Sequence, residues 1–326
     1  MVTTEKQQPL PGTRPEGARD DREAAARVRD IFTRIAPRYD FLNHLLSFSL
    51  DHLWRRRTAN KFLHILRGSD ARILDLCCGT GDLAFALARA RASSLRQATT
   101  SYLERSRRAA VPKSEEKSGD LAPEGDRRVE NVATLASKVE ARRFSPAESD
   151  SLLLGALAPE GLSSPFPIFG GDFVEPMLVR AREKAHAGRR AVVFVAADAL
   201  HLPFPDASFD LITTAFGFRN LANYEEGLRE FARVLKPGGE VGILEFTDPV
   251  SGPLAGLFRF YFKNVLPRIG AAISGNAEAY KYLPGSVSKF PSPPELSALI
   301  EKCGFRDVRI ASWNFGSVIL HTARRM

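Results

Sequence analysis

The sequence predicts an α/β fold in which a doubly wound, mainly parallel seven-stranded sheet carries a long surface insertion. Three observations favour this class: continuous apolar runs, helical stretches between them, and one long segment too polar to form a core. Continuous apolar runs are typical of parallel strands that are covered on both faces. Five runs come first along the chain, and we expect strands at 71–78, 165–173, 191–198, 209–217 and 240–246.

Helical stretches separate these runs, and they lie at residues 82–90, 175–187 and 223–235. Two more strand-like runs follow Gly304, at 305–312 and 315–322, and would complete a sheet of seven strands. Strands that alternate with helices in this way predict a sheet with helices on both of its faces.

The segment 91–164 is rich in Ser, Ala, Arg and Glu, and its only aromatic residues are Tyr102 and Phe144. Such a composition buries little apolar surface. We therefore expect a low-complexity surface insertion, partly disordered, with short helices around 94–110 and 129–143. Residues 31–90 and 165–326 would form one domain, and residues 1–30, which mix both charge signs with Pro and Gly, would form a mobile arm.

Composition narrows the class of protein. Lys and Arg number 46 against 38 Asp and Glu, and this net charge of +8 favours nucleic acid or an anionic membrane surface as a neighbour. The chain lacks a basic, aromatic groove motif for nucleic acid, an apolar run of the roughly 20 residues that span a bilayer, and a secretory signal. Three cysteines are too few for a disulfide scaffold, and the lack of a Cys-x-x-Cys pair excludes zinc-ribbon and thioredoxin classes. We therefore expect a cytoplasmic protein, and the missing groove motif predicts no nucleic acid as partner.

Glycines follow the first predicted strand in the stretch Asp75-Leu76-Cys77-Cys78-Gly79-Thr80-Gly81. Glycine permits positive φ angles and close approach of a ligand to the backbone, and the following helix start offers N–H groups to an anion. Thr80 adds a hydroxyl group. The stretch lacks the third glycine of a dinucleotide fingerprint and the Gly-Lys-Ser/Thr of a P-loop, so a simple tight turn stays open as an alternative.

Acidic residues follow the next two strands. Gly170-Gly171-Asp172 ends the second, where a carboxylate can accept both hydroxyls of a ribose, and Asp198-Ala199 ends the third, where a carboxylate can accept from the amine of adenine. Each aspartate alone could instead cap a helix or a turn. Because parallel strands end at one edge of a sheet, we expect these groups to share a ligand site.

Four segments resemble class I S-adenosylmethionine methyltransferases, which have a Rossmann-like fold: LDLCCGTGD, GGDFVEPML, AADALHLPFPDASFD and RVLKPGGEVGILEF. Further stretches resemble the UbiE/MenG family in particular. They are Tyr39–Ser47 with Asp51 and Trp54, the FGFRN of 216–220, the LPRIG of 266–270 and the YKYL of 280–283. The resemblance covers residues 31–90 and 165–325.

The resemblance implies a C-methyltransferase that acts on the ring of demethylmenaquinol or of a polyprenyl-benzoquinol. It implies S-adenosyl-L-methionine as methyl donor, no metal, and a polyprenyl quinol substrate met at the inner face of the cytoplasmic membrane, with 250–290 as a lid or membrane-facing segment. A homodimer stays open. The residues expected to bind the cofactor are Asp75, Gly79, Thr80, Gly81, Asp172, Asp198 and Ala199.

Carbon methylation needs an electron-rich ring, so we expect the reduced quinol, whose hydroxyl resembles a phenol with a pKa of about 10. Arg219 offers fixed positive charge and Asn220 can hold a hydroxyl or a water, so both would orient the quinol oxygen and a water that takes the proton. Tyr280, and less strongly Tyr39 and Asp40, would line the same pocket. Open alternatives are a helix cap at 219–220, another lipid or small phenol as acceptor, and a non-catalytic cofactor-binding partner.

Overall fold

The computed structural model describes residues 18–68, 70–109, 168–188, 190–247 and 285–326, together with residues 12, 15, 256, 260–265, 268 and 282. Within this part of the chain, seven strands form one sheet in the order β3-β2-β1-β4-β5-β7-β6. The strands are β1 (Ile73–Leu76), β2 (Ile168–Asp172), β3 (Val192–Ala196), β4 (Phe209–Ala215), β5 (Leu235–Phe246), β6 (Phe305–Trp313) and β7 (Val318–Arg325). The sheet predicted from the apolar runs is therefore confirmed.

The first five strands are parallel to one another, whereas β7 runs antiparallel between β5 and β6. β1 lies at the centre of the parallel part, with β2 on one side and β4 on the other. The loops that leave β1, β2, β3 and β4 consequently emerge at one edge of the sheet, where open α/β sheets bind ligands.

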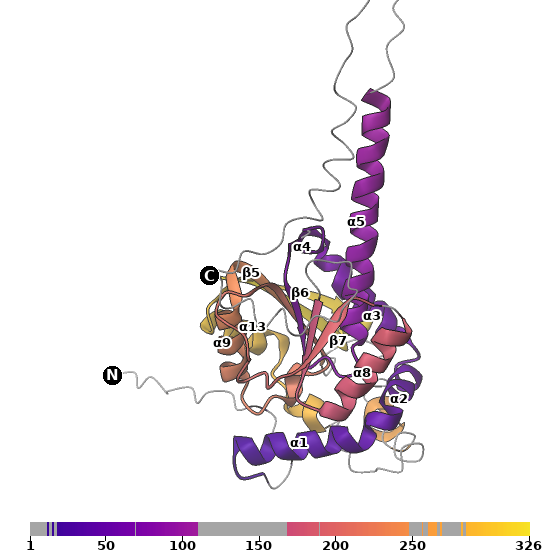
Figure 1. The fold of residues 1–326 in the computed structure, drawn as a ribbon. Helices are drawn as coiled ribbons and strands as arrows, with labels where there is room; N and C mark the ends of the chain where they lie inside the picture. The colour runs from indigo at the N-terminus through magenta and orange to yellow at the C-terminus, as the bar shows by residue number, and fades with distance from the viewer. Residues whose placement is uncertain are drawn as a thin grey trace, which may run out of the picture. The chain divides into compact units, whose positions relative to one another are not determined.

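Helices cover both faces of the sheet, as Figure 1 shows. One face carries α3 (Leu50–Lys61), α4 (Leu63–Leu66), α5 (Asp82–Ala109) and α8 (Glu175–Ala187), and the other carries α9 (Tyr224–Val234) and α13 (Pro293–Lys302). On the first face, Phe62 and Phe85 share a buried cluster with Ile73 and Leu211 of the strands. This core fixes the helix starts relative to the strand ends.

The helices expected at 82–90 and around 94–110 form one continuous helix, α5, which ends at Ala109. Residues 91–109 include five Arg, three Ala and two Leu, which are good helix formers, so this polar part of the expected insertion is helical. The described residues up to Arg96 and from Ile168 onward belong to one compact unit, and Gln97–Ala109 belong to a second. The helix expected at 129–143 lies outside the described residues.

An N-terminal helix, α1 (Asp21–Ile35), begins within the stretch expected as a mobile arm. The Asp20 side chain accepts from the Glu23 backbone N–H and so caps the helix. Its apolar residues recur on one buried face, which packs beside α8, and they are Ala24, Val28, Ile31 and Ile35. A 3-10 turn (Ala36–Arg38) then leads into α2 (Tyr39–Leu46).

Among the described helices, none is both long enough and apolar enough to cross a bilayer. Most of the segment 250–290 lies outside the described residues, as does Tyr280. The described pieces include a short π-helix (Tyr261–Val265) and the single residue Tyr282.

Candidate active site

The ends of the parallel strands border a cavity of about 730 Å³, called here the strand-end cavity. The loops after β1, β2, β3 and β4 form most of its wall, and α1 and Tyr39 close it on another side. Six residues that the sequence singled out line this cavity together: Tyr39, Gly79, Asp172, Asp198, Ala199 and Asn220.

The loop after β1 depends on unusual backbone angles. Cys77, Gly79 and Gly81 have φ angles of 51°, 54° and 87°, a region that glycine adopts without strain. A Cβ atom on Gly81 would lie 2.7 Å from the Phe194 ring, so only glycine fits there. Gly79 presents bare backbone to the strand-end cavity, whereas Gly81 packs behind it.

Asp172 ties two of these loops together. Its Oδ2 accepts from the Gly79 backbone N–H at 2.8 Å, and its Oδ1 accepts from the Val174 backbone N–H at 2.9 Å. Burial raises the pKa of Asp172, and the backbone hydrogen bonds oppose that shift. Asp172 lines the cavity, so its carboxylate can also accept from hydroxyl groups of a ligand there.

Asp198 differs from Asp172 in its exposure. It lies on the surface at the rim of the strand-end cavity, and its Oδ1 accepts from the Leu200 backbone N–H at 3.0 Å. The neighbouring Ala199 is buried and adds an apolar wall. The two residues together offer one acceptor and one flat apolar contact.

Three residues predicted to bind the cofactor do not line the strand-end cavity: Asp75, Thr80 and Gly81. Asp75 is buried within the sheet, where it accepts from the Thr213 hydroxyl at 2.8 Å. Burial raises the pKa of Asp75 to about 7. In this structure Asp75 therefore supports the loop after β1 from within the fold.

Thr80 belongs to a network that joins α2 to the start of α5. Its hydroxyl donates to Asp40 and accepts from Lys184 Nζ at 3.1 Å. Lys184 also donates to Asp40 at 3.0 Å and to Asp82 at 2.6 Å. Thr80 and Asp40 thus hold α2 in place, which brings Tyr39 into the cavity wall.

A second cavity of about 700 Å³, called here the helix-side cavity, lies next to the first. The two cavities share Phe32, Tyr39 and Phe216 as walls. Ile31, Ile35 and Phe246 make much of the remaining wall apolar, and six further residues supply its polar groups: Asn43, Ser47, Asp51, Arg55, Arg219 and Tyr282.

Phe216 forms the partition between the two cavities. Its φ angle is 60°, which is strained for a bulky residue. Its ring stacks on Phe246 with 4.4 Å between ring centroids and meets Trp54 edge-on. These aromatic contacts hold the strained residue at the point where the cavities adjoin.

Arg219 lines the helix-side cavity rather than the strand-end cavity. Its Nη1 donates to Glu245 Oε2 at 2.8 Å and to the Phe216 carbonyl, and its backbone N–H donates to Glu245 Oε1 at 3.0 Å. Both side chains are buried. The positive charge expected to face an acceptor is therefore balanced by Glu245, a partner that sequence reasoning did not identify.

Asn220 and Tyr282 connect the two cavities. Asn220 lines the strand-end cavity, Tyr282 lines the helix-side cavity, and the Tyr282 hydroxyl donates to Asn220 Oδ1 at 3.1 Å. Burial raises the pKa of Tyr282 to about 12, so it stays protonated. Sequence reasoning selected Tyr280 from the YKYL stretch, although the same stretch also contains Tyr282.

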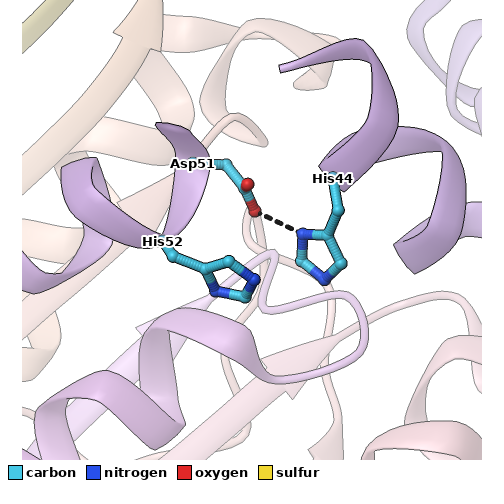
Figure 2. A group of neighbouring side chains, drawn as sticks. All are labelled: His44, Asp51 and His52. Carbon is cyan, nitrogen blue, oxygen red and sulfur yellow. Dashed lines mark hydrogen bonds and ion pairs between the residues drawn. The ribbon is translucent and has the colours of Figure 1, made fainter. Parts of the chain in front are cut away.

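Sequence reasoning also missed the environment of Asp51, at the start of α3. Asp51 Oδ2 accepts from His44 Nδ1 at 2.8 Å, a contact drawn in Figure 2, and also from Arg55. Asp51 Oδ1 accepts from the Ser47 hydroxyl at 2.8 Å. Burial alone would raise the pKa of Asp51, but Arg55, Ser47 and His44 hold it below its usual range.

His44, Asp51 and His52 bring three possible metal-binding atoms within 4.8 Å of one another (Figure 2). The His44 and His52 rings stack at 4.2 Å between centroids. However, Asp51 Oδ2 already accepts from the Arg55 guanidinium, and a divalent cation at that oxygen would lie beside a fixed positive charge. The contacts favour a hydrogen-bonded carboxylate at this place over a metal centre.

Comparison with known families is decisive here. The model of the ubiE/COQ5 methyltransferase family matches residues 20–143 and 153–325, which is most of the chain. The chain belongs to this family. The match confirms the family resemblance and extends it into α1 and α5, and the chain is accordingly an S-adenosylmethionine-dependent methyltransferase with the class I fold.

Several relatives within the family are similar over nearly their whole length. A demethylmenaquinone methyltransferase of Deinococcus radiodurans is 39% identical, with 93% of each chain covered. One of Thermus thermophilus is 38% identical over 90% of this chain and 100% of the relative. The Geobacter sulfurreducens ubiquinone/menaquinone biosynthesis C-methyltransferase UbiE is 34% identical over 93% and 90%.

Proposed function

We propose that this chain methylates a ring carbon of a reduced polyprenyl quinone precursor, with S-adenosylmethionine as donor and demethylmenaquinol as acceptor. The observation that carries the proposal is the pair of adjoining cavities, which share Phe32, Tyr39 and Phe216. The first cavity combines two carboxylates and bare glycine backbone with apolar walls, and the second has aromatic walls, so the pair suits a charged donor beside a flat ring. The Deinococcus and Thermus relatives, both named for demethylmenaquinone, support the choice of acceptor.

The strand-end cavity fits S-adenosylmethionine. Asp172 would accept the two ribose hydroxyls, Asp198 and Ala199 would contact adenine, and the bare backbone at Gly79 would leave room for the amino-acid end. The bound donor supplies a methyl group that its sulfonium charge activates. Phe216 would keep water away from the point of transfer, because its ring fills the partition between the cavities.

The helix-side cavity would hold the quinol ring between Phe216 and Tyr39. Tyr282 donates to Asn220 Oδ1, so the NH₂ end of Asn220 is the one that can donate to a quinol oxygen. Arg219 braces this wall through Glu245 and the Phe216 carbonyl. We therefore propose that Asn220 and Tyr282 orient the quinol hydroxyl and that Arg219 forms part of the polar wall beside that hydroxyl. Tyr280 keeps its sequence-based assignment to the same pocket.

A membrane contact follows from the substrate, whose prenyl tail lies in a bilayer. Exposed apolar side chains lie on α2, on the turn before α3 and on α3 itself: Phe41, Leu45, Phe48, Leu50 and Leu53. Phe48 contacts Tyr261 at 5.8 Å between ring centroids, and Phe260 beside it is also exposed. Because Asn43, Ser47 and Asp51 of the same segment line the helix-side cavity, this apolar face would let the tail pass from the inner leaflet to the ring site.

The test is methyl transfer by the pure chain from methyl-labelled S-adenosylmethionine. Reduced demethylmenaquinone and a reduced polyprenyl-benzoquinol are offered separately, each beside its oxidised form as the matched control. We expect labelled product from the reduced naphthoquinol and none from either oxidised quinone, since only the reduced ring is electron-rich. Preference for the benzoquinol would assign the chain to the ubiquinone pathway, and no label in any quinol would refute the proposal.

A further inference from the structure

Ring methylation leaves one proton to be removed. The polar groups of the helix-side cavity are unequal in their ability to take it. Tyr39 and Tyr282 are phenols whose pKa values burial raises, so both remain protonated, and Arg55 and Arg219 are cations. Among the described residues that line this cavity, Asp51 is the one carboxylate.

Asp51 is held firmly and yet keeps one site for a proton. Its side chain is 3% exposed. Ser47 occupies one acceptor site on Oδ1, while His44 and Arg55 share Oδ2. A carboxylate offers about four acceptor sites, so one site on Oδ1 remains among the described contacts.

We propose that Asp51 accepts the proton released by ring methylation and that His44 positions it for this task; the inference rests on the proposed function. As the ring carbon gives an electron pair to the methyl group, the bond from methyl to sulfur breaks and sulfur leaves as a neutral thioether. The hydroxyl proton passes to Asp51. The ring C–H hydrogen then returns to the oxygen as the ring regains aromaticity, so one proton leaves per methyl transferred, and Asp51 gives it to solvent when the product departs.

A carboxylate of low basicity is adequate for this step. The Arg55 guanidinium and the Ser47 hydroxyl favour the ionised form of Asp51, which keeps it ready before each turnover. A ring hydroxyl becomes far more acidic once the ring has given up an electron pair to the methyl group, so the acceptor need not be a strong base. A short-lived proton on Asp51 also leaves easily for the next cycle.

His44 contacts Asp51 from the side that is nearer the surface. Its side chain is 28% exposed, whereas that of Asp51 is almost completely covered. The charged and titratable groups around His44 are Asp51, Arg55 and His52 of α3 and Asp82 of α5. The hydrogen bonds from His44 and Arg55 to Oδ2 fix the Asp51 carboxylate, so loss of the His44 donor should lower turnover.

The experiment compares three variants of the full chain with the wild type, using labelled S-adenosylmethionine and whichever reduced quinol the wild type methylates. Asp51→Asn should lower kcat by about 100-fold or more, the range typical of a lost general base. Its affinity for S-adenosylmethionine, measured by calorimetry, should remain within about threefold, because Asp51 does not line the strand-end cavity. A kcat above one tenth of wild type would overturn the proposal.

His44→Ala and His44→Gln form the matched pair. Loss of the His44 donor in His44→Ala should lower kcat by about 10-fold, whereas Gln at 44 still carries an N–H that can donate to Asp51, so His44→Gln should recover most of that loss. A kcat for His44→Ala equal to that of the wild type would overturn the proposal, and this pair decides the matter if Asp51→Asn fails to fold. Inactivity of the wild type toward every quinol would refute the proposed function instead.

Discussion

The strand-end cavity and the helix-side cavity share three aromatic walls, but their polar groups are held in different ways. In the strand-end cavity, Asp172 and Asp198 accept hydrogen bonds from backbone N–H groups of the loops they belong to or adjoin. In the helix-side cavity, Arg219 and Asp51 are held by other side chains, Glu245 and Arg55. The polar groups of the strand-end cavity are positioned by the loops at the strand ends, and those of the helix-side cavity are positioned by ion pairs.

This difference predicts how the two cavities respond to substitution. When a carboxylate that accepts from backbone N–H groups is removed, water can take its place as the acceptor for those N–H groups. Removal of one member of a buried ion pair leaves a buried charge without its partner, which costs about 3–5 kcal/mol. Variants in the helix-side cavity should therefore affect both turnover and stability, and variants in the strand-end cavity should mainly affect donor affinity.

The largest effect is expected for Arg219→Ala. Loss of the guanidinium leaves Glu245 buried and unpaired and removes the support of the Phe216 carbonyl, so we expect kcat to fall at least about 100-fold with a lower melting temperature. Donor affinity, measured by calorimetry, should change less than about threefold. Arg219→Lys is the control, because it keeps the charge opposite Glu245 and should recover most of the stability but little of the turnover. Unchanged turnover in the Ala variant would remove Arg219 from the mechanism.

A smaller effect, confined to binding, is expected for Asp172→Ala. Loss of a carboxylate that accepts two ribose hydroxyls should weaken S-adenosylmethionine binding by about 10- to 100-fold, because a hydrogen bond to a charged group contributes about 1.5–3 kcal/mol. Asp198→Ala should weaken binding less, since Asp198 is exposed. Asp206→Ala, on the surface beside Arg233, serves as the control. Equal donor affinity in Asp172→Ala and wild type would discard the ribose assignment.

The same contrast explains how much of the molecule the sequence could predict. Apolar runs gave the seven strands, and the rule that parallel strands end at one edge brought Gly79, Asp172 and Asp198 together. Asp75 belongs to strand β1 and faces Thr213 within the sheet, whereas Thr80 and Gly81 follow Gly79 in a tight turn, which directs neighbouring residues to different sides. Periodicity carries no information about that alternation within a loop.

The helix-side cavity was harder to predict because its walls come from distant parts of the chain. Arg55 of α3 and Asp51 form a local pair that spacing could suggest, but Glu245 lies 26 residues from Arg219 and at the end of a strand. A buried ion pair between separate elements has no sequence signature of its own. α1 was also missed, because the Asp20 cap and one apolar face lie beside a Pro- and Gly-containing stretch that suggested an arm.

A weaker effect is expected at the outer rim of the helix-side cavity. Phe48 is 74% exposed and Phe315 is 73% exposed, and both have a φ angle above 50°, so they form a matched pair. Phe48→Ser should lower co-flotation with vesicles of anionic lipid by about 10-fold or more, because a buried Phe contributes about 1.5–3 kcal/mol. Phe315→Ser should float like wild type. If both variants float equally well, the apolar face around Phe48 does not contact the membrane.

The smallest effect on catalysis is expected for Asp75→Asn, which lies behind the strand-end cavity. Burial raises the pKa of Asp75 to about 7 from an ordinary value of 3.8, so the folded state binds a proton more tightly than the unfolded state. Its contribution to stability is full below pH 3.8 and is lost as the pH rises through about 7. The Asn variant cannot ionise and keeps an oxygen for the Thr213 hydroxyl, so its unfolding free energy should decline less between pH 5 and 8.

Urea unfolding of both proteins at pH 5 and pH 8 measures this difference, which should be on the order of a few kcal/mol. The same variant tests the sequence-based assignment of Asp75 to donor binding. Because Asp75 does not line the strand-end cavity, we expect donor affinity to stay within about threefold of wild type. Identical pH dependence in the two proteins would mean that Asp75 is already ionised in the folded state. A large loss of donor affinity would show that the charge of Asp75 affects donor binding through the loop after β1.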